Sequence, residues 1–141
     1  GESRGSGHLE LRRRVSSRVY FWSGVLGVAF AIIIFVFAQT LPSLFTADQS
    51  VKLAATDGLR LLAIALIPGA IAFAGDGVLI GLSDSRFLGL AAFAHTAIMA
   101  LALFSESIRT GPGLSGIWAL LVLWMIMRAL TVTARSRVLL R

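Results

Sequence analysis

The stretch VYFWSGVLGVAFAIIIFVFA, residues 19–38, holds twenty residues without a formal charge. A helix of about 20 apolar residues is long enough to cross the roughly 30 Å hydrocarbon core of a bilayer. Tyr20 and Trp22 lie close to Arg18, and aromatic side chains are enriched where a membrane helix meets the headgroups. We therefore predict a first transmembrane helix over residues 19–38.

The composition of the whole chain agrees with this stretch. Of its 141 residues, 57% are hydrophobic and 14% are charged, whereas soluble domains have about 45–50% apolar and about 25% charged residues. A water-soluble domain of this size would need a charged surface that these residues do not supply. The chain is therefore predicted to be an all-α integral membrane protein.

A second, longer helix is predicted over residues 49–82. It is expected to begin near Gln49, because Thr46, Asp48 and Ser50 offer side-chain oxygens that can cap it. Pro68 and Gly69 lie in the middle of this stretch. Proline removes one backbone hydrogen bond and clashes with the preceding turn, so a kink is expected there.

Two more transmembrane helices are predicted, over residues 87–104 and 114–134. A short polar turn at 83–86 precedes the first of them, and a turn at 105–113 with Pro112 between two glycines separates the two. The expected architecture is a helical bundle with four transmembrane helices.

Basic residues gather on one side of this predicted bundle. Residues 1–18 are predicted to form a basic cytoplasmic segment, a linker leading into a helix at the membrane surface, and residues 135–141 a basic cytoplasmic tail. That side holds Arg4, Arg12, Arg13, Arg14, Arg18, Arg86, Arg135, Arg137 and Arg141, with Arg128 near it. The other side holds Lys52, Arg60 and Arg109. Because cytoplasmic loops carry the excess of Lys and Arg, both termini are expected in the cytoplasm.

Asp76 and His95 are the candidate functional residues. A carboxylate within a membrane span is costly in hydrocarbon and usually faces a bundle interior or a watery cavity. Asp76 is therefore a candidate proton or substrate site, with a structural hydrogen bond to another helix as the alternative. His95 is a second candidate, and the same structural alternative applies to it. Arg128 is expected to reach the cytoplasmic interface with its long side chain, with a role in substrate binding as the alternative.

Three glycines surround Asp76. Gly75, Gly77 and Gly81 are candidate helix-packing positions, because Gly77 and Gly81 form a small-xxx-small pattern that lets another helix approach closely. Packing within one bundle and dimerisation both remain open.

Several function classes are excluded by what the sequence lacks. The absence of cysteine excludes disulfides, thiolate metal sites and cysteine nucleophiles. No nucleophile motif, P-loop or dinucleotide fingerprint occurs, and no ligand pairs stand at metal spacing. We predict no enzyme, no metal, no cofactor and no nucleic-acid partner.

The stretch IPGAIAFAGDGVLIGLSDSRFL, residues 67–88, resembles the tenth transmembrane helix and following turn of the multidrug and toxic compound extrusion (MATE) family. The likeness is to the DinF-like branch, where a D-G-V-x-x-G-x-x-D-x-R pattern recurs. Residues 44–51, beginning Leu-Phe-Thr-Ala-Asp, resemble the segment that leads into that helix. Residues 118–130 resemble the last helix of the family. The turn reads Gly-Leu-Ser-Asp here where the family usually has Gly-Ala-Gly-Asp, and a carboxylate that some branches carry early in this helix is replaced around Gly69.

This resemblance implies spans nine to twelve of a twelve-helix cation-coupled antiporter. It implies protons as the coupling ion, an organic cation or drug-like substrate, and a bacterial inner (cell) membrane location among lipids. The N-terminal transporter helices would be missing from this chain, so it is expected to be inactive alone. Asp76 matches the aspartate of the motif. Two alternatives stay open: a small four-span protein with a structural or regulatory role, and a related lipid flippase.

Overall fold

The structure is a computed structural model that describes residues 2–105 and 113–141, with side chains described for residues 8–105 and 114–141. Within these ranges the chain is almost entirely helical and contains no strand. The helices are α1 (Glu2–Phe37), α2 (Thr40–Ser43), α3 (Gln49–Gly81), α4 (Ser85–Phe104) and α6 (Gly113–Leu139). The predicted turn at 105–113, with Glu106 and Arg109, lies almost wholly outside the described residues.

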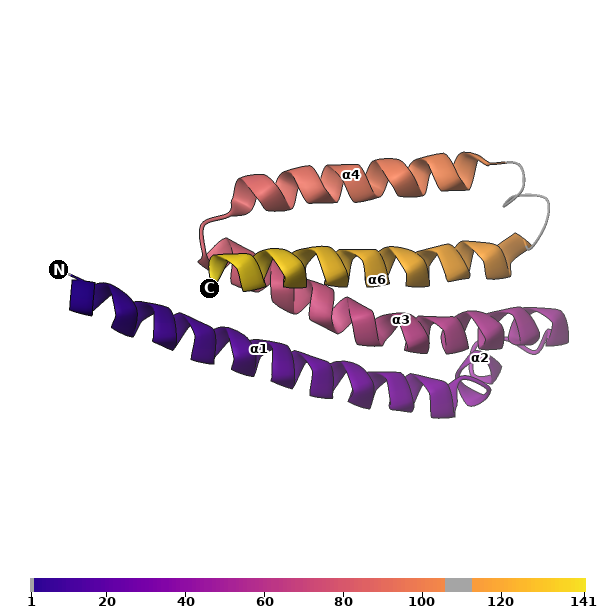
Figure 1. Ribbon diagram of the computed structural model, residues 1–141. Helices are drawn as coiled ribbons and strands as arrows, with labels where there is room; N and C mark the ends of the chain where they lie inside the picture. The colour runs from indigo at the N-terminus through magenta and orange to yellow at the C-terminus, as the bar shows by residue number, and fades with distance from the viewer. Residues whose placement is uncertain (1, 106–112) are drawn as a thin grey trace.

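The four long helices lie side by side in the order α1, α3, α6, α4 (Figure 1). Helix α3 packs against both α1 and α6, while α4 packs mainly against α6. Helix order in space therefore differs from order in the chain. The beginning of α1, the α3–α4 turn and the C-terminus lie at one end of this layer, and α2 lies at the other end (Figure 1).

Four of the described helices are long and apolar enough to cross a membrane. They are His8–Phe37, Gln49–Gly81, Ser85–Phe104 and Leu114–Leu139. Large apolar side chains on α1 and α4, such as Phe21, Phe30 and Phe93, are exposed. In water such a surface would be strongly unfavourable, so lipid or further membrane helices must cover it. The prediction of a helical membrane bundle with four spans is confirmed.

The basic segment differs from its expected form. Residues 2–18 are the first part of α1 and run without a break into the apolar span. No linker and no separate surface helix are found there. The physical reason is that the arginines and leucines of this segment are good helix formers, and the stretch holds no proline. The C-terminal tail is likewise helical as far as Leu139.

Helix α3 begins at Gln49, as its local chemistry indicates. The Oδ1 atom of Asp48 accepts hydrogen bonds from the backbone N–H of Ser50 (2.8 Å) and of Val51 (3.3 Å), and from the Ser50 hydroxyl (2.6 Å). These hydrogen bonds hold the pKa of Asp48 below its ordinary value, and the bond from the Ser50 hydroxyl has the largest effect. Pro68 lies inside the helix, and the kink stays a prediction.

The turn between α3 and α4 ends α3 with a Schellman motif. The backbone N–H of Asp84 donates to the carbonyl of Leu79, and that of Ser83 donates to the carbonyl of Ile80, each at 3.0 Å. In this motif the residue after the helix adopts the left-handed conformation, and Ser83 has φ 61°. Glycine is the usual residue at such a position because it has no Cβ to clash.

The substitution Ser83→Gly is therefore expected to stabilise the protein by about 1 kcal/mol, the cost of holding a residue with a Cβ in this conformation. Ser83→Ala is the matched control and should bring no gain, because alanine also carries a Cβ. Thermal unfolding in detergent, followed by circular dichroism, measures both. Equal effects of glycine and alanine would contradict the argument.

Candidate functional site

An ion pair joins α3 to α6 within the membrane-spanning region. The Nη2 atom of Arg128 donates to Oδ2 of Asp76, and the two side chains are 18% and 15% exposed. A lone charge at this depth would be costly, and a partner of opposite sign offsets much of that cost. Asp76 therefore faces the neighbouring helix and not lipid.

Aromatic rings enclose the guanidinium of Arg128. Its central carbon lies 5.5 Å from the ring centroid of Phe73 on α3 and 5.5 Å from that of Trp124 on α6. Ring faces attract cations, and more strongly where water is excluded. The second carboxylate oxygen of Asp76, Oδ1, is buried without a hydrogen-bond partner among the described residues. Buried polar atoms normally have partners, so this oxygen is open to a donor group from outside the described residues.

His95 reaches the same helix from α4. It is 7% exposed, and its Nε2 lies 3.2 Å from the hydroxyl oxygen of Thr131, one turn after Arg128. The Thr131 hydroxyl in turn donates to the carbonyl of Met127 at 2.8 Å. The two candidate residues thus meet one helix, α6, at adjacent turns. Neither of them contacts the other directly.

An apolar cavity of about 440 Å³ lies beside the ion pair, between α1, α3 and α6. Phe73, whose ring contacts Arg128, forms part of its wall, and Phe30, Gly69 and Met125 are other lining residues. This volume is within the range of about 300–1,000 Å³ that is usual for small-molecule sites. Charge at Asp76 and Arg128 can therefore act on a molecule in this cavity through one layer of side chains.

Gly75 lets α1, α3 and α6 approach one another next to Asp76. A Cβ built on it would lie 2.8 Å from Val132 Cβ and 2.9 Å from the Tyr20 hydroxyl, too close for real atoms. A Cβ on Gly77 or Gly81 would meet no atom within 4 Å in the described part of the chain. For these two positions, helix packing stays a prediction.

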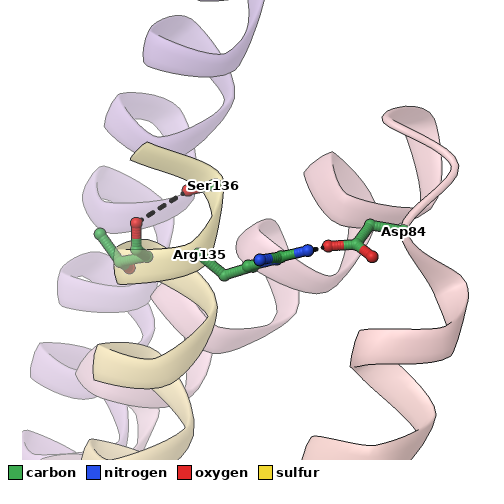
Figure 2. Close-up of polar contacts among 4 residues, drawn as sticks. Asp84, Arg135 and Ser136 are labelled. Carbon is green, nitrogen blue, oxygen red and sulfur yellow. Dashed lines mark hydrogen bonds and ion pairs between the residues drawn. The ribbon is translucent and has the colours of Figure 1, made fainter. Parts of the chain in front are cut away.

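A second ion pair ties the end of α6 to the α3–α4 turn. The Nε atom of Arg135 donates to Oδ2 of Asp84 at 2.7 Å (Figure 2). The guanidinium also lies over the Phe87 ring, 4.9 Å from its centroid. Ser136, which follows Arg135, shares a 2.9 Å hydrogen bond with Tyr20 of α1. Three helices are thus fastened together at the arginine-rich end.

Sequence reasoning singled out Asp76 and His95, whose functional roles stay a prediction, but it did not foresee the contact between Arg128 and Asp76. It placed Arg128 at the cytoplasmic interface, whereas the structure pairs it with Asp76. The available signal was an acidic residue, Asp76, deep in one predicted span and a basic residue, Arg128, within another. Among the described side chains, no group of three His, Asp or Glu residues could hold a metal ion.

A family model for MatE matches residues 1–105, three quarters of the chain. The chain belongs to the MatE family. This match confirms the predicted resemblance at the level of the family, whose members are helical membrane transporters. It includes Asp76 and His95, while α6 lies beyond it. Neither the curated proteins nor the solved structures contain a match to the chain.

Proposed function

We propose that this MatE chain is the C-terminal part, spans nine to twelve, of a proton-coupled multidrug efflux antiporter of the DinF-like branch. The observation that carries the proposal is the Asp76–Arg128 ion pair beside an apolar cavity. Lipids surround it in a bacterial cell membrane. Both termini lie in the cytoplasm, since the basic ends of α1 and α6 share one end of the layer.

Proton binding at Asp76 would couple to substrate through electrostatics. While Asp76 is ionised, its charge and that of Arg128 cancel, and the cavity accepts an organic cation. A proton on Asp76 neutralises the carboxylate and leaves the positive charge of Arg128 uncompensated behind Phe73. That charge repels a cationic substrate, more strongly in a low-dielectric site than in water. Proton uptake and cation release are then linked, as antiport requires.

The helices described here form one open layer, so a closed cavity needs helices from outside this chain. Transporters of this kind bind substrate between two halves. We therefore infer that this chain is inactive alone. His95 is proposed as a positioning residue for α6, because its contact with Thr131 lies one turn from Arg128.

The test is proton-driven efflux of a cationic dye by the complete transporter, in membrane vesicles carrying the double variant Asp76→Asn/Arg128→Gln. Removing both charges together leaves no lone buried charge, so the protein should still fold. Efflux is expected to fall to the level of vesicles without transporter. Asp57→Asn, an exposed carboxylate paired with Arg60 outside this cluster, is the matched control and should keep full activity. Unchanged coupled efflux by the double variant, at equal protein level, would refute the proposal.

A further inference from the structure

A second cavity, of about 400 Å³, lies between α1 and α6 at the arginine-rich end of the layer. It is separate from the cavity beside Asp76 and shares no lining residue with it. Its polar lining residues include Arg13, Ser17, Tyr20, Thr133, Ser136 and Arg137. Two cations and several hydroxyl groups thus surround one space, and the proposed transport mechanism uses none of them.

The two arginines of this cavity have no acidic partner. Within residues 8–105 and 114–141, no carboxylate forms an ion pair with Arg13 or Arg137. Arg13 donates from Nε to the carbonyl of Leu140, just past the end of α6, where helix carbonyls have no partner in their own helix. Its remaining N–H groups stay free for an anion. Two guanidinium groups without acidic partners are a positive site for a ligand of opposite charge.

The hydroxyl groups are held in the wall of the cavity. Ser136 is 1% exposed; its hydroxyl donates to the Thr133 carbonyl at 3.0 Å and shares a hydrogen bond with the Tyr20 hydroxyl. Ser16, which also lines the cavity, is 8% exposed. The Thr133 hydroxyl oxygen is buried without a hydrogen-bond partner among the described residues. Buried polar groups normally have partners, so an unsatisfied hydroxyl in this wall points to a polar ligand.

We propose that this cavity binds the phosphate group of an anionic phospholipid. Arginine forms paired hydrogen bonds with phosphate oxygens, and hydroxyl groups donate to the oxygens that remain. The cavity opens at the end of the bundle where arginines gather, and basic residues at that level of a membrane attract anionic lipid headgroups. Ile71 and Leu140 supply apolar surface to the same cavity. The site would fasten α1 to α6 through the lipid.

The experiment is native mass spectrometry of the purified chain in detergent, with phosphatidylglycerol or phosphatidylcholine added. Phosphatidylglycerol is expected to bind more tightly than phosphatidylcholine. Arg137→Gln should weaken phosphatidylglycerol binding about tenfold, as expected for loss of one charged hydrogen-bond donor group. The side chain of Arg137 makes no hydrogen bond or ion pair in the described residues, so its replacement should leave the fold intact, which circular dichroism checks.

Arg14→Gln is the matched control, because Arg14 follows Arg13 on α1 and does not line the cavity. It removes the same net charge and should weaken binding by less than about twofold, an effect of long-range charge only. Equal losses in the two variants would overturn the proposal and mean that any surface arginine suffices. Equal binding of the two lipids would overturn it as well. Inorganic phosphate that competes fully with phosphatidylglycerol, at equal concentration, would show that the site takes free phosphate and not lipid.

Discussion

Asp76→Ala is expected to lower the free energy of unfolding by about 3 kcal/mol, because it leaves the Arg128 guanidinium charged and unpaired between helices. The double variant Asp76→Asn/Arg128→Gln should recover most of that loss, since no uncompensated charge remains. Unfolding of the purified protein by sodium dodecyl sulfate in mixed micelles, followed by circular dichroism, measures the difference. Asp57→Ala, at an exposed pair, should leave stability unchanged within error.

A double-mutant cycle of Asp76→Asn, Arg128→Gln and the two changes together, measured in the same micelles, decides between two roles of this pair. If the losses in unfolding free energy of the two single variants add up to that of the double variant, the ion pair does not contribute to stability. If they couple strongly, α3 and α6 are held together by charge at the level of the proposed proton site. Protonation of Asp76 would then weaken the attachment of α3 to α6. A weaker attachment would let the two helices move relative to each other, as the proposed transport mechanism requires.

The start of α3 could be predicted because its causes are local in the chain. Asp48 and Ser50 are two residues apart, and the capping hydrogen bonds need nothing beyond the next turn. The four transmembrane helices could also be predicted, since the length and apolar content of a stretch decide whether it crosses a bilayer. The start of α1 could not be predicted, because its basic segment and its apolar segment form one continuous helix. No helix-breaking residue marks the point where the helix leaves the membrane.

The ion pair could not be predicted, because 52 residues separate Asp76 from Arg128. Their contact depends on α6 lying beside α3, while α4, which comes between them in sequence, lies on the outer side of α6 (Figure 1). Helix spacing within one segment does not give that order. A charge in each of two spans indicated that each charge needs a partner, but not that the two charges are partners of each other.

The glycines around Asp76 also show that the sequence alone does not tell which helices become neighbours. Gly75 and Gly77 are two residues apart, which is about 200° around a helix, so they lie on nearly opposite faces. The sequence marks both as small, yet an added Cβ would clash with α6 and α1 only at Gly75, whereas Gly77 lines an open pocket beside α1. Which face is covered is a property of the neighbouring helices and not of the motif.

Gly75→Ala is expected to destabilise the protein by about 2 kcal/mol, the usual cost of adding a methyl group to a filled interior. The new Cβ would lie 2.8 Å from Val132 Cβ and 2.9 Å from the Tyr20 hydroxyl, so α6 and α1 must both shift. That shift would also strain the hydrogen bond between Tyr20 and Ser136. Unfolding in mixed micelles measures the loss.

Gly77→Ala is the matched control on the same helix. In this chain its Cβ meets open space, so the change should be neutral or stabilise by up to about 1 kcal/mol through helix propensity. Made in the complete transporter that we propose, the same change should instead destabilise, if a helix from outside this chain packs against the small-xxx-small face. A stabilising effect in both settings would mean that Gly77 faces lipid, and that the pattern around Asp76 serves α1 and α6 through Gly75 alone.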